Sequence, residues 1–255
     1  MKSGVDLRYF QWYNSKDMKK KITGWIKKQL KQAQAKGIVL GLSGGVDSAL
    51  VAALAKEAAG SKRVLGLFMP VHSHKQDLRD AMLVARKLGI KTKLIDLSAI
   101  YDALIRILPP AGRKAEANLK PRLRMAVLYY FANKLNYLVS GTGNKSELMV
   151  GYFTKHGDGA TDILPIGDLL KKDVRSLALN LRIPRHIIAK PPTAGLWQGQ
   201  TDEGEMGITY PELDAILEGL ESKKKQVVTR KKVAKVKAMI KKSEHKRQGP
   251  KICSI

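Results

Sequence analysis

The residues that most constrain the fold form a short glycine- and serine-rich stretch, residues 41–48, between two apolar runs. Residues 38–40 before it have the composition of a buried strand, and residues 49–55 after it that of an alanine-rich helix. A strand, a tight turn and a helix in this order present unpaired backbone N–H groups at the turn. Glycine lets an anion approach those groups closely, and the helix dipole favours negative charge there. The stretch therefore predicts a phosphate-binding loop.

A turn that needs glycine only for its geometry is the simpler alternative, and a lone glycine pair would not separate the two. The full string is more specific. It lacks the Gly-x-x-x-x-Gly-Lys-Ser/Thr pattern and the Gly-x-Gly-x-x-Gly fingerprint. It resembles the ATP pyrophosphatases, which cleave ATP between the α- and β-phosphates. The resemblance implies adenylation of an oxygen atom followed by displacement. The string consists of Gly41, Leu42, Ser43, Gly44, Gly45, Val46, Asp47 and Ser48.

Strand-like and helix-like segments alternate along the chain. This order predicts an α/β fold, a doubly wound parallel sheet with helices on both faces, and the resemblance implies an adenine nucleotide alpha hydrolase-like topology. Without a repeat or a break in composition, we expect a single domain over residues 1–255 with a basic tail of about ten residues. The expected strands are 38–40, 63–70, 93–97 and 137–141. The expected helices are 18–33, 78–88, 100–108, a buried one from 125, 169–181 with Asp168 as its cap, 211–221 and 227–241, with a mobile segment at 112–120.

Charge and cysteine content narrow the class of protein. Lys and Arg number 47 against 22 Asp and Glu, a formal net charge of +25. Such an excess of positive charge favours polyanionic partners, either nucleic acid or nucleotides. Many of the lysines also fit the solvated faces of helices. Net charge alone does not distinguish a polyanion-binding protein from one with solvated lysine-rich helices. The single cysteine, Cys253, argues against an internal disulfide, a cysteine zinc site and a redox pair. Without a membrane-spanning run or a signal-peptide pattern, a cytoplasmic location is expected.

A second loop, residues 141–147, also follows an expected strand. It resembles a Walker A loop but has Asn144 where a glycine is required, so a plain turn fits it equally well. Its position adds weight, because parallel strands deliver their C-terminal loops to one edge of the sheet. Thr142 could reach a nucleotide there. Asp47 and Glu147 could share Mg²⁺, which binds one or two carboxylates together with phosphate oxygens.

Five segments occur in the order found in NAD synthetases, which the chain resembles over nearly its whole length. They are the string at 41–48, Gly-Thr-Gly-Asn-Lys-Ser-Glu at 141–147, Gly-Tyr-Phe-Thr-Lys-His-Gly-Asp-Gly at 151–159, Leu-Trp-Gln-Gly-Gln-Thr-Asp-Glu at 196–203, and Glu-His-Lys-Arg at 244–247. The third segment reads on its own as a solvated turn or, more strongly, as a ligand loop. The resemblance implies that deamido-NAD, ATP and ammonia are converted with Mg²⁺ into NAD, AMP and pyrophosphate by a homodimer with its dinucleotide site at the interface.

The resemblance also implies roles for individual residues. Residues 41–48, Thr142, Lys171 and Thr193 would bind ATP, and Asp47 and Glu147 would bind Mg²⁺. A separate hypothesis, independent of the resemblance, is that residues 242–247 become ordered only over bound substrate. The expected deamido-NAD contacts are Arg122, Lys155, Asp162, His245 and Lys246.

Two residues depart from the family pattern, and two other functions stay open. His156 stands where tyrosine is common and Pro121 where alanine is usual, which affects the expected loop geometry. Another ATP pyrophosphatase, such as a tRNA-modifying enzyme, would suit the net charge, although Cys253 is poorly placed for thiolation. A non-catalytic nucleotide- or nucleic-acid-binding protein is a third possibility, but mere binding does not require both Asp47 and Glu147.

Overall fold

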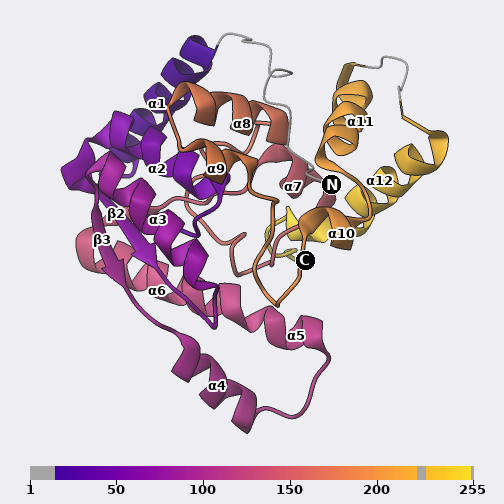
Figure 1. Cartoon of the computed structure of the whole chain (residues 1–255), viewed down its shortest axis with the longest axis horizontal. Helices are drawn as coiled ribbons and strands as arrows, with labels where there is room; N and C mark the ends of the chain where they lie inside the picture. Colours follow the sequence, from indigo (N-terminus) through magenta and orange to yellow (C-terminus); the bar gives the residue numbers. More distant parts are fainter. Residues whose placement is uncertain (1–14, 223–227, 254–255) are drawn as a thin grey trace.

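The computed structural model describes residues 15–222 and 228–253. Four parallel strands form one sheet in the order β3-β2-β1-β4 (Figure 1). Parallel strands need long crossovers, and here helices provide them. The sheet continues past β4 through a single parallel bridge between Ser140 and Ile163. The strands are β1 (Gly37–Gly41), β2 (Val64–Phe68), β3 (Lys91–Leu94) and β4 (Tyr137–Val139).

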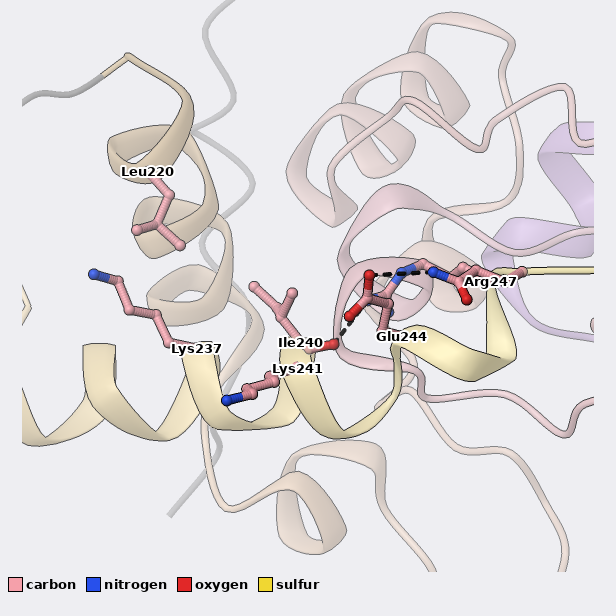
Figure 2. A pocket seen from close by; sticks show the side chains of 7 residues that line it. Leu220, Lys237, Ile240, Lys241, Glu244 and Arg247 are labelled. Carbon is pink, nitrogen blue, oxygen red and sulfur yellow. Dashed lines mark hydrogen bonds between the residues drawn. The ribbon is translucent and has the colours of Figure 1, made fainter. Parts of the chain in front are cut away.

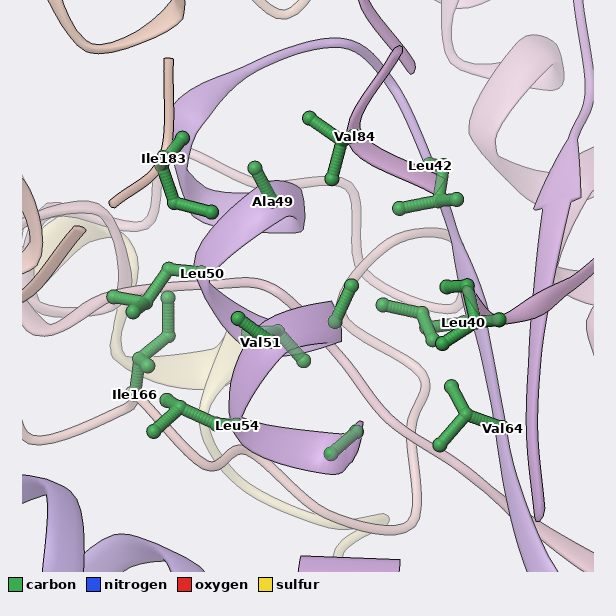
Figure 3. Packing of buried hydrophobic residues seen from close by; sticks show 14 of the residues in the cluster. Leu40, Leu42, Ala49, Leu50, Val51, Leu54, Val64, Val84, Ile166 and Ile183 are labelled. Carbon is green, nitrogen blue, oxygen red and sulfur yellow. The ribbon is translucent and has the colours of Figure 1, made fainter. Parts of the chain in front are cut away.

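One face of the sheet carries the largest apolar cluster. Ile38 and Leu40 of β1 point to this face, since alternate residues of a strand point to opposite sides. Leu50 and Leu54 of the neighbouring helix pack against the same cluster (Figure 3). The alanines of that helix allow its backbone to lie close to the sheet. This layer contains α1 (Ser15–Gln32), α2 (Val46–Ala59), α3 (Lys75–Leu88), α8 (Lys171–Asn180) and α9 (Arg185–Ala189).

The opposite face is covered by α4 (Ser98–Ile107) and α6 (Leu119–Leu135). Val39 of β1 and Leu65 and Leu67 of β2 are buried beneath them. The expectation of a buried helix from residue 125 was wrong, because the outer side of α6 is open to solvent. Several large apolar side chains of this layer are exposed, namely Ile100, Ile107, Leu108 and Tyr130.

The remaining helices form a separate cluster at the end of the molecule away from β3 (Figure 1). Tyr210 and Leu213 lie at its centre. The cluster joins the sheet layer where α11 contacts α8. Within the described ranges, no helix is long and apolar enough to cross a membrane. These elements are α7 (Lys145–Val150), α10 (Asp202–Met206), α11 (Tyr210–Ser222), α12 (Arg230–Lys242) and the short 3-10 turn η3 (Glu244–Lys246).

Three further expectations need correction. The segment 112–120 contains a short helix, α5 (Arg113–Ala117), instead of a mobile connection. Asp168 does not cap α8, which begins at Lys171; the Asp168 carboxylate pairs with Lys145 Nζ at 3.0 Å. Val227, expected as the first residue of the last helix, lies outside the described residues.

Candidate active site

The glycine loop between β1 and α2 is held open by its own side chains. The Ser43 N–H donates to Ser48 Oγ at 3.2 Å, and the Ser48 hydroxyl donates to the Gly45 carbonyl at 3.0 Å. Gly44 has φ of +79°, and a Cβ there would lie 2.3 Å from the Asp77 carbonyl oxygen. Only glycine fits, because it tolerates positive φ and leaves room for α3. The hydrogen bonds of the Ser48 side chain therefore fix the conformation of the loop that leads into the first turn of α2.

The second loop begins α7 and contacts the first loop. Asn144 is the N-cap of α7: its side chain accepts from the Glu147 N–H at 3.1 Å, and Glu147 Oε2 accepts from the Asn144 N–H at 3.3 Å. The Asn144 amide donates to Asp47 Oδ1 at 2.9 Å. The residue that breaks the Walker A pattern thus fixes both carboxylates.

Lys171 joins the two carboxylates. Its Nζ lies 2.7 Å from Asp47 Oδ2 and 3.0 Å from Glu147 Oε1, and its side chain is 2% exposed. The start of α8 is fixed by two polar side chains, because the Lys171 N–H donates to Ser146 Oγ and the Lys172 N–H donates to Asp214 Oδ2. These bonds satisfy N–H groups that a helix leaves unpaired, and they direct Lys171 inward.

Burial and mutual charge perturb this cluster. Burial raises the pKa of the Glu147 carboxyl to about 7; attraction to Lys171 opposes the shift and repulsion from Asp47 adds to it. Burial alone would lower the pKa of Lys171, but Asp47 and Glu147 together raise it. Burial also raises the pKa of Asp202, opposed by Lys171. Three carboxyl groups therefore face a single ammonium group.

A cavity of about 560 Å³ lies over these residues at the carboxyl edge of the sheet. Ligand sites of α/β sheets occur at this edge, and the volume suits a nucleotide-sized ligand. Of the residues that the sequence assigns to ATP or Mg²⁺, Gly44 does not line the cavity. Those that do are Gly41, Leu42, Ser43, Gly45, Val46, Asp47, Ser48, Thr142, Glu147, Lys171 and Thr193.

Positively charged groups line another part of the same cavity. Arg122 comes from α6, Lys155 from the 151–162 loop, and His245 and Lys246 from η3. The Lys155 ammonium donates to the His245 carbonyl at 2.6 Å, and Arg122 contacts the Lys155 carbonyl at 3.5 Å. The Lys246 ammonium donates to the carbonyls of Gly151 and Phe153, each at 2.7 Å. Burial lowers the pKa of Lys246.

Besides Gly44, two other residues that the sequence singles out, Asp162 and His156, lie outside the cavity lining. Asp162 accepts from the Val139 N–H at 2.7 Å and from the Tyr129 hydroxyl at 3.1 Å, so it lies between β4 and α6. His156 has φ of +59° and is absent from the lining.

Sequence reasoning missed Tyr210 and Asp202. Tyr210 is 1% exposed, and its hydroxyl lies 2.9 Å from Asp202 Oδ2 and 3.2 Å from Glu147 Oε1. Asp202 belongs to the Gln-Thr-Asp-Glu string noted in the sequence, which was the available signal. No local pattern marks Tyr210.

A second depression lies between α11, α12 and η3 (Figure 2). Its polar groups serve the local fold: the Arg247 guanidinium donates to the carbonyls of Ile240 and Leu148 and to the Ser243 hydroxyl. It contains no carboxylate pair, and we place the active site at the sheet edge.

A parallel sheet between two helical layers, with a glycine loop and an acidic pair at its carboxyl edge, has the architecture of the adenine nucleotide alpha hydrolase-like fold. The NAD synthase family model matches residues 18–250. The chain belongs to the NAD synthase family, and it is a ligase that uses ATP to form a C–N bond.

The relatives cover almost the whole chain. The NH(3)-dependent NAD(+) synthetase of Archaeoglobus fulgidus is 48% identical over 244 residues, covering 95% of this chain and 98% of the relative. The structure of NMN synthetase from Francisella tularensis superposes with a TM-score of 0.89 at 37% identity, covering 95% of this chain and 100% of that one. The NH3-dependent NAD synthetase from Campylobacter jejuni, solved with a nitrate ion, gives a TM-score of 0.83 at 32% identity with the same coverage.

Proposed function

We propose that the chain amidates the nicotinate carboxylate of deamido-NAD, using ATP and ammonia and releasing NAD, AMP and pyrophosphate. The proposal rests on the two sets of residues that line one cavity. The first is the glycine loop with the cluster of Asp47, Glu147 and Lys171, and the second is the group of basic residues described above. Ammonia as the nitrogen donor is supported by relatives whose names specify it and whose lengths this chain matches.

The chemistry requires two displacements. The nicotinate oxygen attacks the α-phosphorus and pyrophosphate leaves; ammonia then attacks the acyl carbon and AMP leaves. Negative charge accumulates on phosphate in the first step, so fixed donors at the loop and at the start of α2 would stabilise it. Once the Lys171 ammonium has left one of its two carboxylate partners, it would pair with the negative charge of the departing pyrophosphate. No side chain needs to act as a covalent nucleophile.

Mg²⁺ fits the acidic pair. Asp47 and Glu147 direct oxygen atoms at one point, and hard oxygen ligands suit this ion. In the described part of the chain, no group of three or more His, Cys, Asp or Glu is arranged to hold a metal ion, so phosphate oxygens would complete the ligand set. Asp47, Glu147 and Asp202 carry three formal negative charges against one on Lys171, an excess that one divalent cation would balance. Bound there, Mg²⁺ would neutralise the charge that develops on the phosphates.

The dinucleotide would use the basic part of the cavity. Arg122 and Lys155 supply charged donors for its phosphates, while Lys246 holds the 151–153 backbone in place. The Asp162 carboxylate points toward α6, so a deamido-NAD molecule that contacts Asp162 would have to approach it next to α6.

We propose a homodimer formed through the outer layer of α4 and α6. Ile107 is 77% exposed and Tyr130 59% exposed, and a second copy of this surface would remove them from water. The Tyr129 hydroxyl, next to Tyr130 in the chain, donates to Asp162, so the expected contact of Asp162 with the dinucleotide would lie near this surface. Sedimentation should show a dimer that Ile107→Asp converts to a monomer; an unchanged dimer would place the interface elsewhere.

Nicotinate mononucleotide is a second candidate substrate. The likeness to an NMN synthetase favours it, because that reaction is the same amidation on a smaller nucleotide. Purified protein should be supplied with Mg-ATP and ammonium, and with each carboxylate substrate in turn. NAD formed with equal amounts of AMP and pyrophosphate supports the proposal. Faster conversion of the mononucleotide favours the second candidate, and no turnover of either overturns both.

A further inference from the structure

One buried side chain outside the proposed chemistry contacts most of the charged cluster. The Tyr210 hydroxyl lies within hydrogen-bonding distance of both Asp202 Oδ2 and Glu147 Oε1, at 2.9 and 3.2 Å. The centroid of its ring lies 4.8 Å from Lys171 Nζ, a distance at which a ring face attracts an ammonium group. Tyr210 therefore touches both Lys171 and one of the two carboxylates that Lys171 joins.

A phenol has one hydrogen to donate, and here two carboxylates lie within reach. Glu147 Oε1 already accepts from the Lys171 ammonium. Asp202 Oδ1 is buried and has no hydrogen-bond partner within the described structure, whereas Oδ2 accepts from the Tyr210 hydroxyl; Tyr152 is a second hydroxyl that lowers the pKa of this carboxyl. While the Lys171 ammonium donates to Glu147, the Tyr210 hydroxyl donates its hydrogen to Asp202. Rotation about the C–O bond would transfer it to Glu147.

Such a transfer matters when the ligands bind. A cation and a triphosphate cannot enter unless Lys171 leaves at least one carboxylate, and Glu147 Oε1 then loses its ammonium donor. A buried carboxylate without a donor is costly. Tyr210 can supply the missing hydrogen bond, and its ring stays within reach of the displaced ammonium.

The Tyr210–Asp202 pair also connects the cluster to the cavity wall. The Tyr210 N–H donates to Glu203 Oε1 at 2.8 Å, and the Asp202 N–H donates to the Pro192 carbonyl at 3.1 Å. Pro192 adjoins Thr193, an expected ATP contact. The pair therefore holds the wall segment and the carboxylates in one arrangement.

We infer that Tyr210, anchored by Asp202, is a positioning residue of this site. Its hydroxyl replaces Lys171 as the donor to Glu147 Oε1, and its ring supports Lys171 while that ammonium exchanges a carboxylate for phosphate. The inference rests on the proposed function.

The test compares Tyr210→Phe, Tyr210→Leu, Asp202→Asn and the double variant Tyr210→Phe/Asp202→Asn, with Tyr137→Phe as control. Tyr137 begins β4 at the opposite edge of the sheet from the cavity. Calorimetry measures the Kd of ATP with and without Mg²⁺, and steady-state assays give kcat and KM. We expect Tyr210→Phe to weaken Mg-ATP binding about tenfold and to leave metal-free ATP binding and Tm near those of the control.

Tyr210→Leu should in addition lower kcat, because it removes the ring beneath Lys171. Asp202→Asn should weaken Mg-ATP binding in the wild-type background and have no effect in the Tyr210→Phe background, because Asp202 acts through the hydroxyl. Mg-ATP affinity of Tyr210→Phe equal to wild type, or effects that multiply in the double variant, would overturn the inference. A wild-type protein that makes no amide product refutes the proposed function instead, and the calorimetric comparison still decides the role of Tyr210.

Discussion

The Asn144 side-chain amide donates to Asp47 Oδ1 at 2.9 Å, and this bond joins two loops that are 97 residues apart in the chain. Asn144 Oδ1 meanwhile accepts from the Glu147 N–H, so one side chain caps α7 and orients the carboxylate on α2. The two functions can be separated by substitution.

Asn144→Ser keeps an N-cap acceptor but cannot reach Asp47, whereas Asn144→Ala loses both bonds. We expect Asn144→Ser to unfold at nearly the wild-type Tm with turnover about tenfold lower. Asn144→Ala should lose a further ~1 kcal/mol of unfolding free energy. Equal turnover of Asn144→Ser and wild type would show that Asp47 does not need this donor.

Asp47→Asn and Glu147→Gln should each reduce turnover by orders of magnitude while the protein stays folded. Each amide keeps the shape of the side chain but loses the charge that the proposed Mg²⁺ site requires. The assay is NAD formation at saturating ATP, with circular dichroism as the check on folding. Near-normal rates in both variants would remove these residues from the Mg²⁺ site.

Lys171→Met should abolish most activity yet increase stabilisation by Mg²⁺. The ammonium lies where a cation between Asp47 and Glu147 would lie, so its removal leaves two partly buried carboxylates without a shared counter-charge. We expect a lower Tm without metal and a larger rise in Tm with Mg²⁺ than in wild type. Lys172→Met, at a half-exposed neighbour, is the matched control. If Mg²⁺ does not change the Tm of Lys171→Met, the Lys171 ammonium and Mg²⁺ do not compete for the position between Asp47 and Glu147.

Stability of the metal-free protein should fall as pH rises from about 4.5 to about 7. Burial raises the pKa of Glu147 from 4.5 to about 7, so in this window the folded chain holds a proton that the unfolded chain has lost. The contribution is complete below pH 4.5 and disappears through pH 7, and it amounts to about 3 kcal/mol for this shift. Glu147→Gln should flatten the slope of unfolding free energy against pH.

Gly44→Ala should cost more than Gly60→Ala, although both glycines have positive φ. At Gly60, with φ of 82° and ψ of 149°, nothing lies within 4 Å of an added Cβ, so only backbone strain of about 1–3 kcal/mol is expected. At Gly44 the methyl group would meet the Asp77 carbonyl and push α3 from the loop. Urea unfolding measures the loss of unfolding free energy in each variant. We expect Gly44→Ala to lose ATP binding and Gly60→Ala to keep it.

The sequence was sufficient for the parts of the fold that rest on local pattern. The glycine loop and the alternation of strands and helices predicted the parallel sheet and its binding edge. The spacing Asn144-x-x-Glu147 is that of a capping box, so the N-terminus of α7 was also within reach of sequence reasoning. Comparison with Walker A obscured that signal.

The remaining features depend on contacts between distant residues. Tyr210 reaches Glu147 across 63 positions, and no period or motif encodes that meeting. The apolar run at 125–132 indicated burial, but side chains of α6 are exposed because no further layer within residues 15–222 and 228–253 covers them. Hydrophobicity shows which side chains favour burial and leaves open which surface covers them.

The bonds from Lys246 to the carbonyls of Gly151 and Phe153 also bear on the order of folding. The cavity wall draws on residues from Gly41 to Lys246, so its contacts span nearly the whole chain. Long-range contacts form slowly because the intervening chain must first be ordered. During synthesis, β1, α2 and the glycine loop emerge long before η3. The ribosome must therefore release almost the entire chain before the cavity can close, and the completed binding site is among the last parts of this protein to form.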